Sequence, residues 1–425
     1  MSASAAAEPL ASRVADLKAG PARLLLCPAP VPDVVSFRGS FRTAPDLSAT
    51  DDLRQALVAD LLDKGTRRRD RFEIAELLEG RGAQLHLYAD ALRAGFAGRA
   101  LREDLPLVLS LLAEQLREPA FPEEEFDKER RQSIAAVRRS MDSTAGQATG
   151  ALTRRLYPDN HPNYVPPPEV ELARLEAIAH GDVVAYHRDH FGSDALTIAF
   201  AGDIEPTGLA RQVAEALGEW TPTGRSPAFA SVAAPAPAGR VAVHIADRPN
   251  VDVRMGHAID LRRDSVDWLA AHAGAFALGG NFSSRLMQIV RDEMGLTYGI
   301  GASVHNVAVE HDGHLLVHAS LSADRLEEGL GATRAVIDAF ASGGILPGEL
   351  ERVKSTLAGQ HVVALATTGG LAARLLVNAE RGFDVDYLDR FPDLVHSLTK
   401  PEVDAAIQRH IRPGNMHVAV AGSVV

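Results

Sequence analysis

The chain of 425 residues repeats one order of sequence features, and this duplication limits the folds open to it. Residues 194–204, DALTIAFAGDI, form an apolar run that ends in Ala-Gly-Asp, and residues 415–425, NMHVAVAGSVV, contain one that ends in Ala-Gly-Ser. A polar helix pattern that closes on a histidine precedes each run. Residues 101–132 and 321–355 also correspond, since both combine an amphipathic helix, a Pro turn and a charged helix. A spacing of about 220 residues is far longer than a solenoid repeat, so we expect two copies of one domain.

A Pro-, Ala- and Ser-rich stretch without periodicity, residues 220–240, separates the two copies. Such a composition is typical of a linker between domains. We therefore predict an N-terminal domain over residues 1–219, a linker over 220–240 and a C-terminal domain over 241–425.

Each copy mixes strand and helix patterns. In the first copy, residues 22–27 (ARLLLC) and 34–41 (VVSFRGSF) have the apolar or alternating character of strands. Residues 51–65 carry leucines on one helical stripe, which stops at Gly65. Two strand patterns, two long helix patterns and a closing strand pattern follow. This order predicts an α+β fold with two homologous domains, each an antiparallel sheet with helices packed on one face.

Charge and cysteine content exclude several classes of function. A net charge of -12 argues against nucleic acid as a partner, because phosphate binding depends on Lys and Arg. The single cysteine, Cys27, rules out a disulfide framework and a site built on several thiolates. The N-terminal residues lack the pattern of a signal peptide, and no apolar run approaches the roughly 18 residues that a membrane span needs. We therefore expect a cytoplasmic chain without a membrane partner.

The stretch from residue 278 to residue 299, LGGNFSSRLMQIVRDEMGLTYG, places two hydrogen-bond donors around a tight turn. Its helix pattern has an apolar stripe, Arg291 lies off that stripe, and Gly295 fits a left-handed helix terminator. The chain then reverses into a strand pattern that contains Tyr298, so Arg291 and Tyr298 can lie side by side. Two adjacent donors could hold a peptide carbonyl or stabilise an oxyanion. On composition alone, a surface ion pair for Arg291 and packing of Tyr298 at the sheet edge explain the residues better.

Three histidines offer an alternative site. His314 and His318 share one face of a predicted strand, and His311 lies just before it. A metal site on these residues is possible, but no third ligand has helical or strand spacing from His314 and His318. A polar sheet face accounts for the histidines better than a zinc site does.

Residues 283–299, SSRLMQIVRDEMGLTYG, resemble the C-terminal-half signature of the pitrilysin-type peptidases, which include the mitochondrial processing peptidases. The family pattern is LGG-x-x-SSRL, followed after a short spacer by R-E-x-x-G-L-x-Y. The resemblance covers essentially the whole chain, including the duplication, the linker and the closing strands. It implies that the two domains form one half of a clam-shell, and that two such chains enclose a chamber for unfolded peptides.

In catalytic members of that family, the N-terminal half carries H-x-x-E-H on a helix, followed by Lys-Gly-Thr, and a glutamate on a later helix completes the zinc site. Here Lys-Gly-Thr is present at residues 64–66. Counting back from it, Ala56 and Asp60 replace the two histidines and Ala59 replaces the base. Ala136 stands where the distal glutamate falls. The resemblance therefore implies no zinc in this chain and no peptidase activity by this chain alone.

The same resemblance implies that Arg291 and Tyr298 contact the substrate backbone near the scissile bond. Gly279 and Gly280, which suggest a flexible loop near the entrance, join them as predicted substrate-binding residues. We expect a non-zinc-binding subunit of a heterodimeric zinc metallopeptidase, whose partner is a homologous subunit that carries H-x-x-E-H and the zinc. A catalytically inactive scaffold and a peptide-binding homodimer are the alternatives, and retention of both Arg291 and Tyr298 favours the heterodimer.

Overall fold

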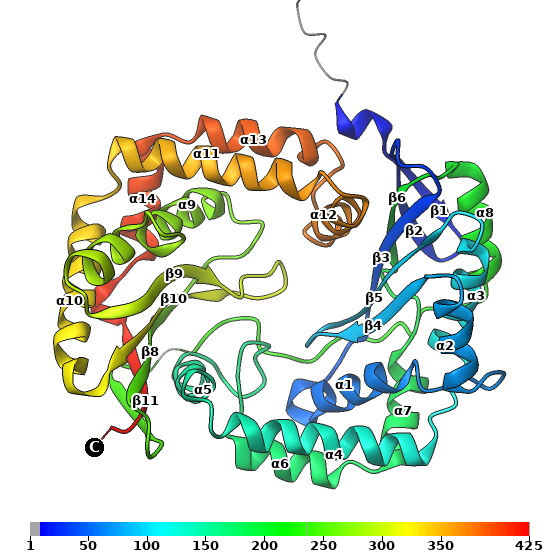
Figure 1. Ribbon diagram of the computed structural model, residues 1–425, viewed down its shortest axis with the longest axis horizontal. Helices are drawn as coiled ribbons and strands as arrows, with labels where there is room; N and C mark the ends of the chain where they lie inside the picture. The colour runs from blue at the N-terminus through cyan, green and yellow to red at the C-terminus, as the bar shows by residue number, and fades with distance from the viewer. Residues whose placement is uncertain (1–8, 235, 425) are drawn as a thin grey trace, which may run out of the picture. The chain divides into compact units, whose positions relative to one another are not determined.

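The computed structural model describes residues 9–234 and 236–424 and divides into two compact units (Figure 1). Unit 1 comprises Met1–Ser133, Arg174–Ala228 and Gln360–Asp393. Unit 2 comprises Ile134–Ala173, Phe229–Gly359 and Leu394–Val425. Each unit therefore takes segments from both halves of the sequence. Residues 1–8, 235 and 425, which belong to the predicted domains and linker, lie outside the described residues.

Unit 1 is built on a six-stranded sheet, sheet 1, with the strand order β1-β2-β6-β3-β5-β4. Its strands are β1 (Ala15–Ala19), β2 (Ala22–Pro28), β3 (Val34–Arg42), β4 (Gln84–Ala89), β5 (Arg93–Leu101) and β6 (Thr197–Gly202). Neighbouring strands run antiparallel except β2 and β6, which run parallel.

Unit 2 is built on a five-stranded sheet, sheet 2, with the strand order β7-β11-β8-β10-β9. Its strands are β7 (Arg240–His244), β8 (Asn250–Ile259), β9 (Thr297–His305), β10 (Gly313–Ser322) and β11 (His417–Gly422). One parallel pair, β7 with β11, again joins an otherwise antiparallel sheet.

Helices make up most of the remaining chain. They are α1 (Asp51–Leu61), α2 (Arg71–Glu79), α3 (Leu105–Arg117), α4 (Glu123–Ser140), α5 (Thr144–Leu156), α6 (Pro168–Ala177), α7 (His180–His190), α8 (Pro206–Leu217), α9 (Trp268–Gly279), α10 (Leu326–Gly343), α11 (Pro347–Ala364), α12 (Thr368–Glu380), α13 (Tyr387–Ser397) and α14 (Lys400–His410), with shorter helical segments η1 (Leu10–Arg13), η2 (Leu47–Ala49), η3 (Met287–Glu293), η4 (Ala323–Arg325) and η5 (Pro413–Asn415). Among the described residues, no single helix is long and apolar enough to cross a membrane. One pair, α11 with α12, meets the same limits of length and composition when taken together, although it is bent by 113°.

The duplicated strands end in the same backbone conformation. Gly202 closes β6 with a φ of 139°, and Gly422 closes β11 with a φ of 150°. A side chain on Gly202 would approach the Val34 carbonyl oxygen to 2.1 Å, so the Ala-Gly end of β6 has no room for a larger residue. The repeated Ala-Gly pair therefore marks the point where each closing strand leaves its sheet.

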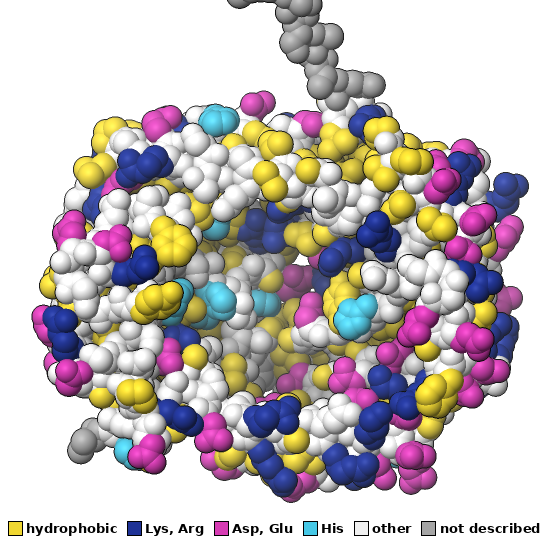
Figure 2. All heavy atoms as spheres, viewed as in Figure 1, with side chains coloured by type: hydrophobic (Ala, Val, Ile, Leu, Met, Phe, Trp, Pro, Cys, Tyr) yellow, Lys and Arg dark blue, Asp and Glu magenta, His cyan; other side chains and the backbone are white. Residues whose placement is uncertain are grey.

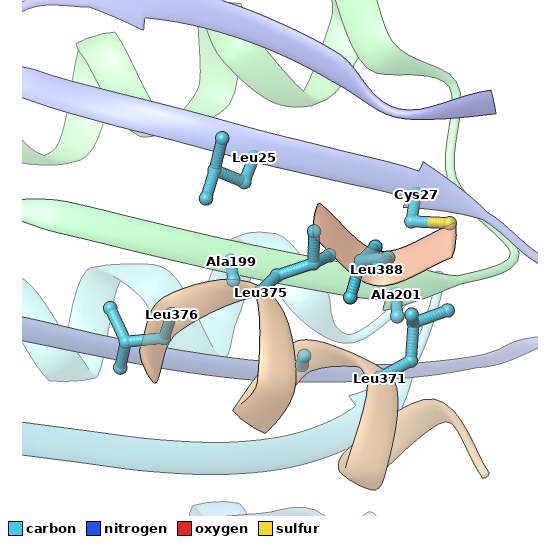
Figure 3. Packing of buried hydrophobic residues seen from close by; sticks show 9 residues of the cluster. Leu25, Cys27, Ala199, Ala201, Leu371, Leu375, Leu376 and Leu388 are labelled. Carbon is cyan, nitrogen blue, oxygen red and sulfur yellow. The ribbon is translucent and has the colours of Figure 1, made fainter. Parts of the chain in front are cut away.

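Each sheet is covered by a helix from the other half of the sequence. α12 packs on β3 and β6 of sheet 1, and α5 packs on β8 and β11 of sheet 2. Figure 3 shows Leu371, Leu375 and Leu376 of α12 against the two neighbouring strands β2 and β6, which contribute Cys27 and Ala201 among others. Because these side chains are buried, the core of sheet 1 is complete only when α12 is in place.

The opposite face of sheet 1 is also covered. α8 contacts β1 and β2, and α3 contacts β5, on the side away from α12 (Figure 1). Residues 24–27 of β2 are accordingly all buried, since a strand covered on both faces carries a continuous apolar run. The predicted α+β fold with two sheet-and-helix units is confirmed. The structure adds one parallel pair in each sheet and helices on both faces.

The Pro-rich stretch 220–240 has little regular structure and is attached to both units in turn. In unit 1 the Ala228 amide donates to the Pro45 carbonyl at 2.9 Å. In unit 2 the Ala234 amide donates to the Leu156 carbonyl at 3.1 Å. The chain passes from one unit to the other after Ala228, within this stretch.

Candidate functional site

The helix pattern in the stretch 278–299 forms a π-helix, η3, rather than an α-helix. The Met294 amide donates to the Ile289 carbonyl at 3.0 Å, and the Leu296 amide donates to the Val290 carbonyl at 3.0 Å. Gly295 then reverses the chain into β9 with a φ of 61°, the left-handed conformation that its sequence position predicts. A π-helical turn holds an extra residue and occurs frequently at functional sites.

The structure brings Arg291 and Tyr298 together, as the reversal at Gly295 predicts. The Arg291 Cζ lies 5.6 Å from the centre of the Tyr298 ring and 5.4 Å from the centre of the Phe282 ring. Tyr298 is 90% exposed and Phe282 is 75% exposed. Arg291 also forms an ion pair with the adjacent Asp292, whose Oδ1 lies 3.5 Å from the Arg291 Nη1. We refer to Phe282, Arg291 and Tyr298 as the aromatic–arginine cluster.

The aromatic–arginine cluster can act as a pair of oriented hydrogen-bond donors. Attraction between a guanidinium and an aromatic ring restricts the arginine side chain without consuming all its N–H groups. The Tyr298 hydroxyl adds one further donor next to them. Since both side chains reach solvent, their donors are available to the carbonyl groups of an extended peptide.

Gly279 and Gly280 have packing reasons to be glycine. A side chain on Gly279, the last residue of α9, would approach the Ala302 amide nitrogen of β9 to 2.1 Å. A side chain on Gly280 would approach the Phe276 ring to 2.4 Å. Gly279 lets the end of α9 lie directly on β9, and Gly280 leaves room for the Phe276 ring of the same helix. The predicted contact of both glycines with substrate stays a prediction.

Arg285 anchors the start of this stretch and was not singled out by the sequence analysis. Its Nε and Nη2 donate to the two carboxylate oxygens of Glu349 at 2.6 and 2.7 Å, and Nη2 also donates to the Gly344 carbonyl at 2.8 Å. Burial alone would raise the pKa of Glu349, but the hydrogen bonds from Arg285 and from the Leu346 amide outweigh it and lower that pKa. The SSRL sequence is the signal for this anchor, and the exposed Phe282 in a polar turn is the signal for the third member of the cluster.

The residues at the predicted zinc-motif positions do not fit a zinc ion. Ala56 and Ala59 lie on α1, Ala136 lies on α4, and none of them has a donor atom. No group of three or more histidine, cysteine or acidic side chains that could hold a metal occurs in the described part of the chain. The side chains at these positions therefore do not form a set of ligands that could hold a zinc ion.

A lysine ammonium stands among the carboxylates near these positions. The Lys64 Nζ lies 2.8 Å from the Asp63 Oδ1 and 3.7 Å from the Glu129 Oε1. Burial and the charge of Glu129 raise the pKa of Asp60, although that residue still reaches solvent. The positive charge next to Asp60 and Glu129 is thus supplied by the protein itself.

The Lys-Gly-Thr turn after α1 is retained and stable. Gly65 adopts a φ of 134°, and the Thr66 hydroxyl accepts hydrogen bonds from the amides of Arg68 and Arg69 at 3.2 and 3.1 Å. The turn therefore has a structural role that does not depend on a metal.

Two of the three histidines, His314 of β10 and His311 just before it, are buried and have polar neighbours. The Nδ1 of His314 lies 2.9 Å from the Tyr157 hydroxyl, and the Nδ1 of His311 lies 2.9 Å from the Asp312 carbonyl oxygen. Burial lowers the pKa of His314 to about 3. His318 is exposed, so the three histidines His311, His314 and His318 do not gather around one point in the described structure.

Two family models match the chain. A model described as "Peptidase M16 inactive domain" matches residues 177–357, and one described as "Insulinase (Peptidase family M16)" matches residues 56–162. The first match contains the whole aromatic–arginine cluster. The second begins at Ala56, the first of the replaced motif positions.

Similar proteins include both proteases and a non-peptidase. An uncharacterized zinc protease of Streptomyces coelicolor is 26% identical over 321 residues, which cover 74% of this chain and 69% of that protein. A non-peptidase homolog of Helicobacter pylori is 21% identical over 391 residues, which cover 90% of this chain and 88% of that protein.

Solved structures share the fold. A peptidase M16 inactive domain from Pseudomonas fluorescens matches with a TM-score of 0.85 and 24% identity, covering 97% of this chain and 98% of that chain. The periplasmic protease PqqL from Escherichia coli matches with a TM-score of 0.80 and 16% identity, covering 98% of this chain but 46% of that chain.

Proposed function

Because the chain belongs to the M16 peptidase family, we propose that it is the non-zinc-binding subunit of a heterodimeric metallopeptidase. In this proposal Arg291 and Tyr298 bind the backbone of an extended peptide, and a homologous partner subunit with H-x-x-E-H carries the zinc. One observation carries the proposal: the Arg291 guanidinium lies near two exposed rings in a chain whose zinc-motif positions hold alanine and aspartate.

The requirement for a partner is supported by the size of one structural relative. This chain matches less than half of the E. coli protease, so that protease has a second region of similar length. A chain that supplies the donors but no zinc ligands would need a second subunit in the same way.

The role of the donors is to bind and orient the substrate. A planar guanidinium and a phenolic hydroxyl can donate to peptide carbonyls of an extended segment. Holding the peptide in one geometry reduces the entropy that the reaction would otherwise lose at the transition state. Phe282 assists by limiting the conformations of Arg291.

The proposal is tested first by recovering the chain from its native lysate with whatever accompanies it. A stoichiometric partner of similar size that contains H-x-x-E-H supports the heterodimer. Recovery of the chain alone or as a homodimer, together with peptide binding, would instead favour a non-enzymatic peptide-binding protein. The alanines at the zinc-motif positions, and the name of the H. pylori relative, are the observations that favour this second candidate.

With the complex in hand, we expect Arg291→Ala and Tyr298→Phe each to lower peptide turnover without dissociating the subunits. Loss of one well-placed donor costs roughly a hundredfold in turnover in other peptidases. Arg240→Ala is the matched control, since Arg240 is also a surface arginine of unit 2 with a neighbouring carboxylate, Glu327. Full activity of both the Arg291→Ala and the Tyr298→Phe complexes would refute the assigned role.

A further inference from the structure

Contacts with α12 identify the residues of sheet 1 that lie on the face covered by this helix. The Ser36 hydroxyl lies 2.8 Å from the Thr368 hydroxyl, and the Ser40 hydroxyl donates to Glu380 at 2.5 Å. Side chains alternate between the two faces along a strand, so every second residue of β3 from Ser36 points to the α12 side.

The strand register gathers arginines on this same face. Arg38 and Arg42 alternate with Ser36 and Ser40 along β3. On β5, Arg99 pairs with Ser36 and Arg93 pairs with Arg42. Directly paired residues of antiparallel strands share a face, so the two strands bring four arginines to the α12 side of the sheet.

α12 adds two more arginines. Arg374 and Arg381 are seven residues apart on or next to this helix and therefore lie on one side of it, two turns apart. Burial, and then the charge of Arg374, lower the pKa of Arg381. We call Arg38, Arg42, Arg93, Arg99, Arg374 and Arg381 the arginine face. Figure 2 shows Lys and Arg side chains gathered beside α12 and sheet 1.

Several of these cations have no carboxylate partner. Within the described residues, no ion pair forms at Arg38, Arg99 or Arg374, whereas most other arginines with exposed side chains in unit 1 have an acidic neighbour, such as Asp16 beside Arg23. Glu380 lies among them, and burial raises its pKa. Three arginines without an ion pair on one face, Arg38, Arg99 and Arg374, are unusual in a chain whose net charge is -12.

We propose that the arginine face binds a carboxylate-rich segment of an extended peptide. This rests on the proposed function and names the substrate class that unit 1 would favour. Arginine forms bidentate hydrogen bonds with carboxylates, and the face contains arginine rather than lysine. The occupant follows from the proposed function, because a member of a peptidase family binds peptides, and oligo-dT tests the alternative polyanion.

The test uses fluorescence anisotropy with the full chain and labelled unstructured peptides. β3 has nine residues, and a peptide of about ten residues at roughly 3.3 Å per residue spans a strand of that length. The probes are a peptide with alternating Glu and Ser, the same peptide with Gln for every Glu, and single-stranded oligo-dT of similar length. We expect the Glu peptide to bind about tenfold more tightly than the Gln peptide, and its binding to weaken with added salt.

Two double variants remove the same charge from different places. Arg38→Gln/Arg99→Gln should reduce affinity for the Glu peptide about tenfold and leave the Gln peptide unchanged. Arg131→Gln/Arg211→Gln, at exposed arginines of α4 and α8 outside the arginine face, is the control and should leave both affinities unchanged. Circular dichroism and the melting temperature establish that each variant is folded.

Three outcomes would overturn the proposal: equal binding of the Glu and Gln peptides, an equal effect of the two double variants, or tighter binding of oligo-dT that Arg38→Gln/Arg99→Gln abolishes. The proposed function fails in a different way. If Arg291 binds the peptide backbone, Arg291→Ala should weaken binding of the Glu and Gln peptides alike. If Arg291→Ala binds the Gln peptide as tightly as the wild type does, the proposed function fails.

Discussion

Phe282 is the member of the aromatic–arginine cluster whose role is purely positional. The centre of its exposed ring lies 5.4 Å from the Arg291 Cζ, and the centre of the Tyr298 ring lies 5.6 Å from the same atom. An exposed cation–π contact is worth about 0.5–1 kcal/mol, which corresponds to roughly a two- to fivefold effect. We therefore expect Phe282→Leu to lower peptide turnover by that factor and Phe282→Tyr to retain it. The ring-current shift of the Arg291 Nε–H resonance, measured by NMR, should be lost in Phe282→Leu.

A matched control for Phe282 exists in unit 1. Phe72 is also exposed, and the Arg71 Cζ lies 4.6 Å from its ring centre. Phe72→Leu should change neither turnover nor the Arg291 resonance. An Arg291 resonance that is identical in the wild type and in Phe282→Leu would show that the ring does not position the guanidinium.

At the scale of single residues, the sequence predicts that Arg291 and Tyr298 lie together but does not predict that Phe282 joins them. The reversal at Gly295 follows from its left-handed conformation, so the proximity of Arg291 and Tyr298 can be inferred from local pattern. Phe282 is nine residues before Arg291 and lies outside any regular element, so no periodicity links the two. The arginine face is equally hidden, because it depends on which residues of β3 and β5 pair.

Among the elements, η3 and α12 differ most from what local pattern indicates. The apolar stripe before Arg291 predicts a helix but cannot distinguish an α-helix from a π-helix, since the extra residue changes the spacing by less than one turn. The apolar stripe of α12 likewise predicts a buried helix without indicating which sheet it covers. Tertiary packing decides that α12, from the C-terminal half of the sequence, covers sheet 1, whose strands come from the N-terminal half.

The packing of α12 on sheet 1 can be tested by fluorescence of the two tryptophans, since Trp220 belongs to unit 1 and Trp268 to unit 2. Leu375 is buried between α12 and sheet 1, and a buried Leu→Ala substitution costs about 2–5 kcal/mol. We expect Leu375→Ala, in a Trp268→Phe background, to lower the urea midpoint that Trp220 fluorescence reports. Leu394→Ala, at an exposed position, should not. A Trp220 transition unmoved by Leu375→Ala would mean that α12 does not stabilise unit 1.

Across the whole molecule, the duplication is the feature that sequence predicts most directly, because each copy repeats the same run of elements and the same closing Ala-Gly turn. The compact units do not coincide with the sequence copies. α5 and α12 each cover a sheet whose strands come mostly from the other half of the sequence, so contacts far apart in sequence decide the unit boundaries. Such long-range packing leaves no trace in hydrophobic periodicity.

Buried histidines in both units make the stability of the molecule depend on pH. Burial lowers the pKa of His187 in unit 1 to about 4, and in unit 2 it lowers the pKa of His257 to about 4 and of His314 to about 3. The unfolded chain has a histidine pKa near 6.5, so it binds more protons than the folded chain between about pH 6.5 and pH 4. Stability is therefore unaffected by these groups above that window and falls as the pH drops through it.

Replacing one of these histidines by a group that cannot titrate should reduce the number of protons taken up on unfolding by one, and with it the pH dependence of the unfolding free energy. We expect His314→Gln, which keeps an acceptor for the Tyr157 hydroxyl, to lower the slope of unfolding free energy against pH by about 1.4 kcal/mol per pH unit between pH 6 and pH 4. Urea unfolding at a series of pH values measures this slope, and His396→Gln at an exposed position is the control. If His314→Gln and the wild type had the same slope, His314 would be protonated to the same extent in the folded and unfolded chains, and burial would not be what keeps this imidazole neutral.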